Sequence, residues 1–135
     1  RLDTDSTGAL LLTNHGQLTQ TLPHPRHHVG KTYRVRVEGS PTADTLEKWR
    51  RGVSLAGQLT AQAQVKLLSP KSPALLEIVL REGRNRQIRR VAERLGHPVV
   101  SLHRSAIGCI RLDDLSSGQY RELTPEEIAN LLALL

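Results

Sequence analysis

The sequence contains no methionine and no phenylalanine, one tryptophan, two tyrosines and one cysteine. Because aromatic side chains are so scarce, we expect leucine and valine to fill the core. A single cysteine cannot form an internal disulfide, which is typical of proteins from a reducing cytoplasm. Cys109 lies in the apolar stretch 107–112, so we interpret it as a buried strand thiol and not as a nucleophile.

Long hydrophobic runs are also missing. No apolar stretch approaches the roughly 18 residues that a membrane span requires, and no signal peptide opens the chain. The sequence therefore argues against a membrane or secreted protein and favours a cytoplasmic one. Because the chain starts at Arg1 and has no methionine, we expect a fragment of a longer protein. Its 135 residues correspond to a single domain.

Basic residues outnumber acidic ones. There are 19 lysines and arginines against 13 aspartates and glutamates, a formal net charge of +6, and the isoelectric point is about 10.2. This balance is typical of proteins that bind nucleic acid. A solvated basic surface has the same composition, so the motifs must distinguish the two.

The hydrophobic pattern changes period several times along the chain. Apolar runs and alternating segments predict strands at 9–13, 32–38, 60–68, 75–80, 99–103, 107–112 and 119–123. Helical spacing predicts a helix over 43–51, a helix with the apolar stripe Ile88, Val91, Ala92 and Leu95, and a terminal helix opened by a capping box from Thr124 to Glu127. Because strands and helices do not alternate regularly, the sequence predicts an α+β fold with a mixed, mostly antiparallel sheet and flanking helices.

Two polar clusters stand out against this pattern. The segment R-L-D-T-D-S-T-G at 1–8 precedes an apolar run, and turn formation explains most of its residues, Asp3 included. The segment E-G-R-N-R-Q-I-R-R at 82–90 surrounds a helix start, where anions bind favourably. On a helical wheel Arg86 and Arg90 point to solvent and are free to contact RNA phosphates. Arg89 lies at the edge of the core, where a cation is usually paired with a carboxylate.

Other titratable clusters have simpler explanations. His24, His27 and His28 lack a carboxylate or cysteine at metal-ligand spacing, so they predict a loop. The pairs at 113–114 and 126–127 fit a turn and a helix cap. The chain has no phosphate-binding glycine loop and no zinc spacing, so we predict no metal and no cofactor.

The two polar clusters, with K-T-Y at 31–33 and G-H-P-V-V-S-L-H-R-S-A-I-G at 96–108, resemble the pseudouridine synthases that modify ribosomal RNA. The similarity runs along essentially the whole chain and lies in the small- and large-subunit branch, closest to large-subunit enzymes without an S4 domain. It implies that residues 1–135 form a pseudouridine synthase catalytic domain. It also implies an N-terminally truncated fold, with upstream strands and any S4 domain absent.

The resemblance implies roles for individual residues. Asp3 matches the catalytic aspartate, and Tyr33 matches the tyrosine that stacks on the target base. Arg89 matches the basic residue that pairs with the catalytic aspartate, so we expect Arg89 within ion-pair reach of Asp3. Arg1 matches the arginine that helps to displace the flipped uridine. The substrate-binding residues are expected to be Arg1, Arg84, Arg86, Gln87 and Arg90.

The expected activity is isomerisation of a uridine in ribosomal RNA, most consistent with the large subunit. The alternative is a non-catalytic RNA-binding module that keeps the basic helix. Asp3 and Tyr33 distinguish the two, because phosphate binding needs neither. The expected partner is ribosomal RNA, without a membrane or a small-molecule cofactor, and the sequence gives no indication of oligomeric state.

Overall fold

The structure is a computed structural model in which residues 1–24, 27 and 29–135 are described. The strands are β1 (Thr7–Gly8), β2 (Lys31–Val37), β3 (Ser54–Leu55), β4 (Gln58–Leu59), β5 (Gln64–Ser69), β6 (Ala74–Leu80), β7 (Val99–Ile107) and β8 (Ile110–Arg111). The helices are α1 (Gly16–Thr21), α2 (Ala43–Arg51), α3 (Gln87–Arg94) and α4 (Pro125–Leu132). The predicted histidine cluster lies partly outside the described residues, because His28 is not among them. None of the described helices is long and apolar enough to cross a membrane.

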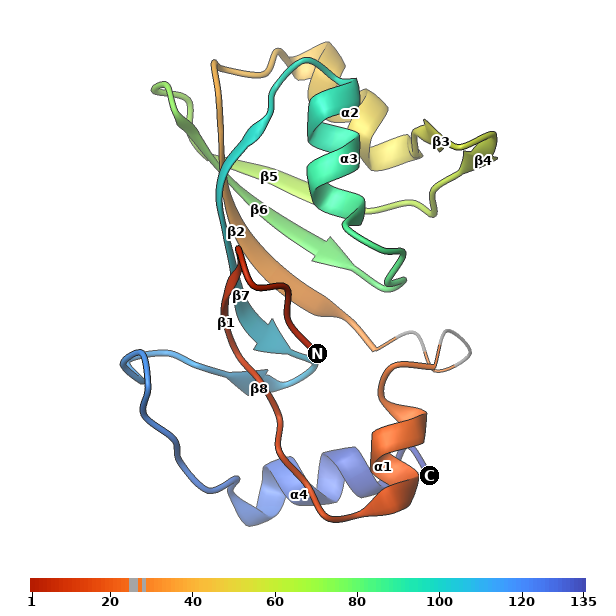
Figure 1. Cartoon of the computed structure of the whole chain (residues 1–135), viewed down its shortest axis with the longest axis vertical. Helices are drawn as coiled ribbons and strands as arrows, with labels where there is room; N and C mark the ends of the chain where they lie inside the picture. The colour runs from red at the N-terminus through yellow and green to blue at the C-terminus, as the bar shows by residue number, and fades with distance from the viewer. Residues whose placement is uncertain (25–26, 28) are drawn as a thin grey trace.

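The centre of the molecule is a six-stranded sheet in the order β1-β7-β2-β6-β5, with β8 paired to β7 (Figure 1). β1 runs parallel to β7, whereas the β2–β6, β2–β7, β5–β6 and β7–β8 pairs are antiparallel. The predicted α+β fold with a mixed, mostly antiparallel sheet is therefore confirmed.

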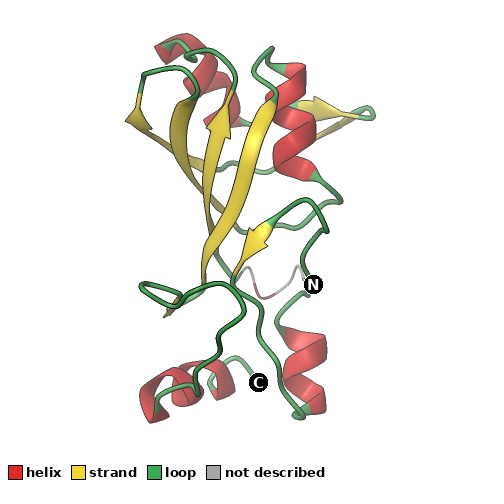
Figure 2. Cartoon of the chain, turned by 60° about the vertical axis from the view of Figure 1, so that its left-hand side comes forward, coloured by secondary structure: helices red, strands yellow, loops and turns green. Residues whose placement is uncertain are grey.

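One face of the sheet carries the main core. Alternate residues of the two central strands are fully buried, among them Val35, Val37, Leu76 and Ile78. α2 and α3 lie beside the upper part of the sheet (Figures 1 and 2) and contribute their apolar stripes to the same cluster. The stripe predicted for α3 is confirmed, because Ile88, Val91 and Ala92 are buried and Leu95 is partly buried. The opposite face of the sheet is exposed at positions such as Arg34 and Lys66.

A second, smaller cluster lies below the sheet, where α1 and α4 meet (Figure 1). Leu18, Ile110 and Leu131 form its buried centre. The predicted capping box opens α4: the Thr124 hydroxyl accepts from the Glu127 N–H, and the Glu127 carboxylate accepts from the Thr124 N–H. The sequence pattern did not predict α1, which is only six residues long.

The predicted strand at 9–13 is wrong. Only Thr7 and Gly8 pair with β7, and the chain then leaves the sheet towards α1. Leu10 is 53% exposed and Leu12 is 86% exposed. An apolar run forms a strand only where a neighbouring strand accepts its backbone hydrogen bonds, and beyond Gly8 the edge of β7 that carries β1 pairs with β8, at Ala106 and Ile107. The predicted strand at 119–123 is absent, and 60–63 lies before β5.

The region around Cys109 also differs from the prediction. The strands expected at 99–103 and 107–112 are one long strand, β7, followed by a tight hairpin to β8. Gly108 and Cys109 form the two-residue turn between them, and Gly108 has a φ of 56°. The Cys109 thiol is consequently exposed and accepts a hydrogen bond of 3.5 Å from the Asn130 amide. The predicted buried thiol is wrong because an apolar run can hide a hairpin turn.

Candidate active site

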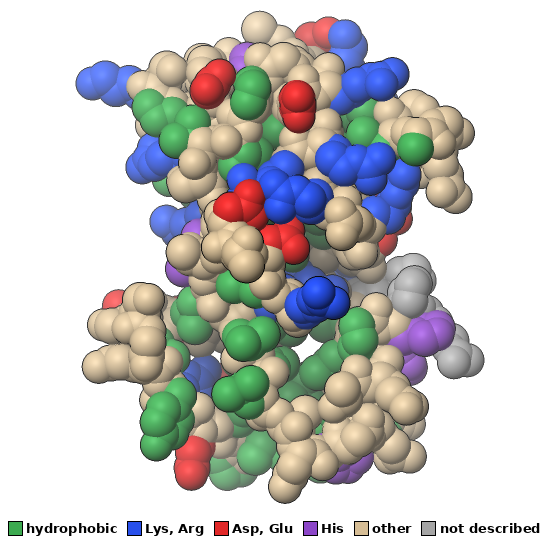
Figure 3. Space-filling model, in the orientation of Figure 1, with side chains coloured by type: hydrophobic (Ala, Val, Ile, Leu, Met, Phe, Trp, Pro, Cys, Tyr) green, Lys and Arg blue, Asp and Glu red, His purple; other side chains and the backbone are tan. Residues whose placement is uncertain are grey.

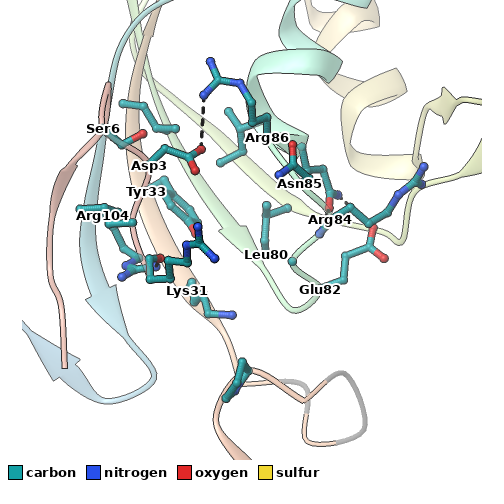
Figure 4. Close-up of a pocket in the computed structure, with 17 residues that line it drawn as sticks. Asp3, Ser6, Lys31, Tyr33, Leu80, Glu82, Arg84, Asn85, Arg86 and Arg104 are labelled. Carbon is teal, nitrogen blue, oxygen red and sulfur yellow. Dashed lines mark hydrogen bonds and ion pairs between the residues drawn. The ribbon is translucent and has the colours of Figure 1, made fainter. Parts of the chain in front are cut away.

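A cavity of about 410 Å³ opens where the N-terminal segment, the central strands and the loop before α3 meet (Figure 4). One side of the cavity carries Asp3, Tyr33, Lys31 and Arg104. The other side carries Glu82 and the loop at 82–87 that follows it. The full lining consists of Arg1, Leu2, Asp3, Ser6, Pro23, Lys31, Tyr33, Leu80, Glu82, Gly83, Arg84, Asn85, Arg86, Gln87, Ile88, Leu102 and Arg104.

Asp3 lies in a turn at the mouth of this cavity. The Ser6 N–H donates to the Asp3 carbonyl at 3.0 Å and closes the turn. The Asp3 carboxylate is 44% exposed and lies 3.5 Å from a guanidinium nitrogen of Arg86 (Figure 4). The turn role expected of this segment and a position in the cavity are therefore compatible.

Asp5 is held between two arginines. Arg86 donates to both carboxylate oxygens, at 3.1 and 2.8 Å. Arg89 donates to the Asp5 carbonyl at 2.7 Å and to the Ser6 hydroxyl at 3.2 Å, and its Nε lies 3.5 Å from the Asp5 carboxylate. The hydrogen bonds from Arg86, together with the charge of Arg89, lower the pKa of Asp5 to about 2.

This arrangement corrects two predictions. Among the described residues the acidic partner of Arg89 is Asp5, whereas Asp3 pairs with Arg86. Arg89 does pair with a carboxylate at the edge of the core, but the expected partner was wrong. Arg86 was expected to be free in solvent, and instead it connects α3 to the N-terminal segment.

The backbone at Arg86 explains why its side chain was misplaced. Arg86 is the N-cap of α3 and has a φ of 50°, in the left-handed region. A helical wheel places only residues with helical backbone angles, so it misplaces this side chain. A left-handed residue other than glycine costs roughly 1 kcal/mol or more, which the contacts to Asp5 and Asp3 help to offset.

A buried network shapes the loop at 82–87. The Gln87 side chain is only 5% exposed and donates to Glu82 at 2.9 Å while accepting from the Arg84 N–H at 3.2 Å. Glu82 also accepts from the Ala61 N–H at 2.7 Å. The Arg84 guanidinium donates to the carbonyls of Leu55 and Gln58, at 2.9 and 3.1 Å. Gln87 and Arg84 thus hold the loop against the β3–β4 hairpin while they line the cavity.

Arg104 anchors the opposite wall. Its side chain, 5% exposed, donates twice to the Ala9 carbonyl, at 2.9 and 2.7 Å, and once to the Arg1 carbonyl at 3.3 Å. Gly8 passes so close to β7 that a Cβ there would collide with the Arg104 backbone. These contacts fix the segment that carries Asp3 against the sheet.

The sequence analysis missed several cavity residues. Lys31 projects from β2 on the cavity side, beside the predicted Tyr33, and Leu80 of β6 pairs with Lys31. Burial, with the Arg104 guanidinium as a second cause, lowers the pKa of the Lys31 ammonium. Lys31 was part of the K-T-Y motif and could have been found there. Arg104 lay just after the strand predicted at 99–103, and the sequence pattern gave no indication of its contacts with residues 1–9.

The structure brings most of the predicted site residues to one place. Arg1, Asp3, Tyr33, Arg84, Arg86 and Gln87 all line the cavity. Arg89 and Arg90 do not line it; Arg90 lies on α3 and donates to the Asn85 carbonyl at 3.4 Å. Figure 3 shows lysine and arginine side chains gathered across the middle of one face, with acidic side chains beside them. No group of three or more metal-ligating side chains occurs within the described residues.

Comparison with known proteins identifies relatives of this fold and sequence. The family model for RNA pseudouridylate synthase matches residues 1–94. The ribosomal large subunit pseudouridine synthase B of Bacillus subtilis (strain 168) is 43% identical over 137 residues, which cover 99% of this chain and 56% of that protein. The ribosomal small subunit pseudouridine synthase A of Escherichia coli (strain K12) is 42% identical, over 98% of this chain and 57% of that protein. This chain therefore spans a little over half the length of these relatives.

Solved structures show the same architecture. A crystal structure of a pseudouridylate synthase superposes with a TM-score of 0.89 at 34% identity, over 96% of this chain and 56% of that one. An H/ACA RNP bound to a substrate RNA containing 2'-deoxyuridine superposes with a TM-score of 0.56 at 18% identity, over 82% of this chain and 38% of that one. The second match shows a shared fold alone.

Proposed function

This chain belongs to the RNA pseudouridylate synthase family, and we propose that its cavity isomerises a uridine of ribosomal RNA to pseudouridine. The large-subunit and small-subunit relatives are almost equally similar to it, at 43% and 42% identity. We propose the large subunit as the source of the target uridine because the arginine-rich segment at 82–90 and the A-I-G strand at 106–108 resemble that branch most closely.

The observation that carries this proposal is the pairing of a carboxylate and an aromatic ring in one basic cavity. Asp3 and Tyr33 come from different segments, and both line the space between β2 and the loop before α3. A module that only held phosphates would need neither group, because arginine and lysine suffice for phosphate binding. The convergence of Asp3 and Tyr33 therefore favours catalysis over simple RNA binding.

The reaction breaks the bond between C1′ of the ribose and N1 of uracil and joins C1′ to C5 after the base has turned. The C5 proton leaves and N1 gains one, so no oxidant or other reactant is consumed. In this proposal Asp3 acts as nucleophile or base. The target base must leave its stack, at a cost of a few kcal/mol. Stacking on Tyr33 offsets part of that cost.

The basic residues divide into two groups in this proposal. Arg1, which lines the cavity, helps to displace the uridine from its stack and to occupy the position that the uridine leaves. Arg86 and Arg90 contact RNA phosphates, and Arg86 gives up part of its contact with Asp3 when RNA binds. Arg84 and Gln87 contribute to substrate binding indirectly, because they hold the loop at 82–87 in place. Arg89 acts through Asp5, by fixing the turn that carries Asp3.

The decisive variant is Asp3→Asn in the complete native protein. The amide keeps the size of the side chain and removes its charge and most of its nucleophilicity. We expect the variant to fold and to bind ribosomal RNA while forming no pseudouridine. Carbodiimide labelling with primer extension, on ribosomal RNA from a deletion strain that carries the variant, measures the product.

Asp44→Asn is the matched control, because Asp44 is an exposed carboxylate on α2 that contacts Lys48 at 3.4 Å. We expect this control to retain full modification. Retained modification in the Asp3→Asn strain would falsify the assignment of Asp3. Loss of folding, seen as a melting shift of several degrees, would instead assign Asp3 to the turn alone.

A further inference from the structure

Lys31 occupies an unusual position for a lysine. It is the first residue of β2, a central strand, and lies between Leu80 of β6 and Ile107 of β7. Its side chain is half-buried on the cavity side of the sheet, the side that also carries Tyr33. Lysine ammonium groups normally reach water or pair with a carboxylate.

The Lys31 ammonium has no partner within the described residues, since it makes no hydrogen bond or ion pair there. The carboxylates that line the same cavity are engaged elsewhere. Glu82 accepts from the Ala61 N–H and from the Gln87 amide, and Asp3 faces Arg86. Burial, and after it the positive charge of the Arg104 guanidinium, lowers the pKa of Lys31 and so disfavours its charged form.

A half-buried cation without a counter-ion costs free energy in the empty protein. Other cations of the cavity wall avoid this cost by donating to the protein: Arg84 to two hairpin carbonyls and Arg104 to the Ala9 carbonyl. Lys31 therefore differs from them in having its charge available inside the cavity. An anionic group of a ligand is the partner that would satisfy it.

We propose that Lys31 binds a phosphate of the RNA, namely one of the two phosphates that adjoin the uridine held in the cavity. This inference rests on the proposed function and adds a phosphate subsite to it. Uracil itself offers only neutral carbonyls, whereas a phosphodiester carries the full charge that a half-buried ammonium needs. Side chains two residues apart on a strand face lie about 6.6 Å apart. Tyr33 and Lys31 are therefore spaced to hold the base and the phosphate of one nucleotide.

Measurements of RNA affinity and of melting temperature distinguish a phosphate-binding role of Lys31 from a structural role. A structural lysine contributes to folding, so its loss lowers the melting temperature. A phosphate-binding lysine without a protein partner is unfavourable in the free protein, so its replacement by an apolar side chain of similar length leaves the melting temperature unchanged or raises it. The proposal thus expects weaker RNA binding without loss of stability.

The test uses Lys31→Met and Lys31→Arg in the complete native protein. The probe is an RNA oligonucleotide spanning the uridine whose modification is lost in a deletion strain. Matched oligonucleotides carry a methylphosphonate, which has no charge, at the 5′ or the 3′ phosphate of that uridine. We expect Lys31→Met to weaken binding of native RNA about tenfold and to reduce the salt slope by about 0.7. Lys31→Arg keeps most of the affinity.

A double-mutant cycle that combines Lys31→Met with the methylphosphonate RNAs tests whether Lys31 contacts the phosphate. Wild-type protein should bind one of the two methylphosphonate RNAs more weakly than native RNA, by about the same factor that Lys31→Met loses on native RNA. Lys31→Met should bind that methylphosphonate RNA no more weakly than it binds native RNA. Lys66→Met, on the exposed opposite face of the sheet, is the control and should leave affinity unchanged. Additive losses with both RNAs, or a lower melting temperature with unchanged affinity, overturn the proposal. Failure of the proposed function is distinct, because wild-type protein would then form no pseudouridine.

Discussion

Asp5 and Arg86 form the shortest ion pair among the described residues of the site, at 2.8 Å, and their contact has a defined pH dependence. The pKa of Asp5 lies at about 2 because Arg86 donates to both of its oxygens, against about 3.9 for an ordinary aspartate. A lowered pKa means that the folded protein holds the proton less tightly than the unfolded chain. The pair therefore stabilises the fold fully above the ordinary pKa, and this stabilisation is lost as the pH falls through about 2.

We expect the free energy of unfolding of Asp5→Asn to fall less between pH 4 and pH 2 than that of the wild-type protein, because the amide has no charge to lose. Chemical denaturation at a series of pH values measures this. At pH 7 the variant should be less stable than wild type, since the ion pair is then intact only in the wild-type protein. Parallel curves for the two proteins between pH 4 and pH 2 would contradict the assigned ion pair.

At the scale of elements, the short β1 strand positions the candidate catalytic residue. Gly8 has a φ of 123°, a value that residues other than glycine rarely adopt. A Cβ at this position would also collide with the backbone of Arg104. Gly8→Ala should therefore destabilise the protein by more than about 1 kcal/mol. It should also lower pseudouridine formation, because the segment that carries Asp3 can no longer lie against β7.

Gly118→Ala is the matched control for this prediction. Gly118 also has a positive φ, 81°, but a Cβ there has no neighbour within 4 Å. It carries the backbone penalty without the collision. Thermal melting and the modification assay, run on both variants, separate the two causes. Equal effects of the two substitutions on melting and on activity would argue against a close approach of β1 to β7.

At the scale of the whole molecule, cationic side chains lie on both faces of the sheet. The cavity face carries the arginines of the loop before α3, whereas Arg34 and Lys66 are exposed on the opposite face. If RNA binds at the cavity, only the first group releases counterions from the RNA. The salt dependence of binding therefore reports which face the RNA occupies.

We expect Arg86→Ala with Arg90→Ala to weaken RNA binding with little sequence preference and to reduce the slope of log affinity against log salt by about 0.7 to 0.9 per lost phosphate contact. The charge-matched pair Arg34→Ala with Lys66→Ala should leave that slope unchanged. Filter binding or fluorescence anisotropy at several salt concentrations gives both values. A reduced slope in the second pair alone would place the RNA on the opposite face.

The sequence by itself determined the fold class and the central elements, and most of the site residues that it predicted line the cavity. The reason is local: the alternation in 32–38, the stripe from Ile88 to Leu95 and the Thr124 cap are properties of consecutive residues, and the structure confirms them. The three motifs also determined the family, because they occur in order along nearly the whole chain.

Only the tertiary structure decided how residues distant in the sequence are paired. Arg89 forms its ion pair with Asp5. Arg86 takes a left-handed backbone that no helical wheel describes, and it pairs with Asp3 and Asp5. The run at 9–13 leaves the sheet because strand formation needs a neighbour, and periodicity does not report one. The free ammonium of Lys31 could be recognised only once Glu82 and Asp3 were seen to have other partners. Pairing depends on distances between segments, and a single sequence does not contain those distances.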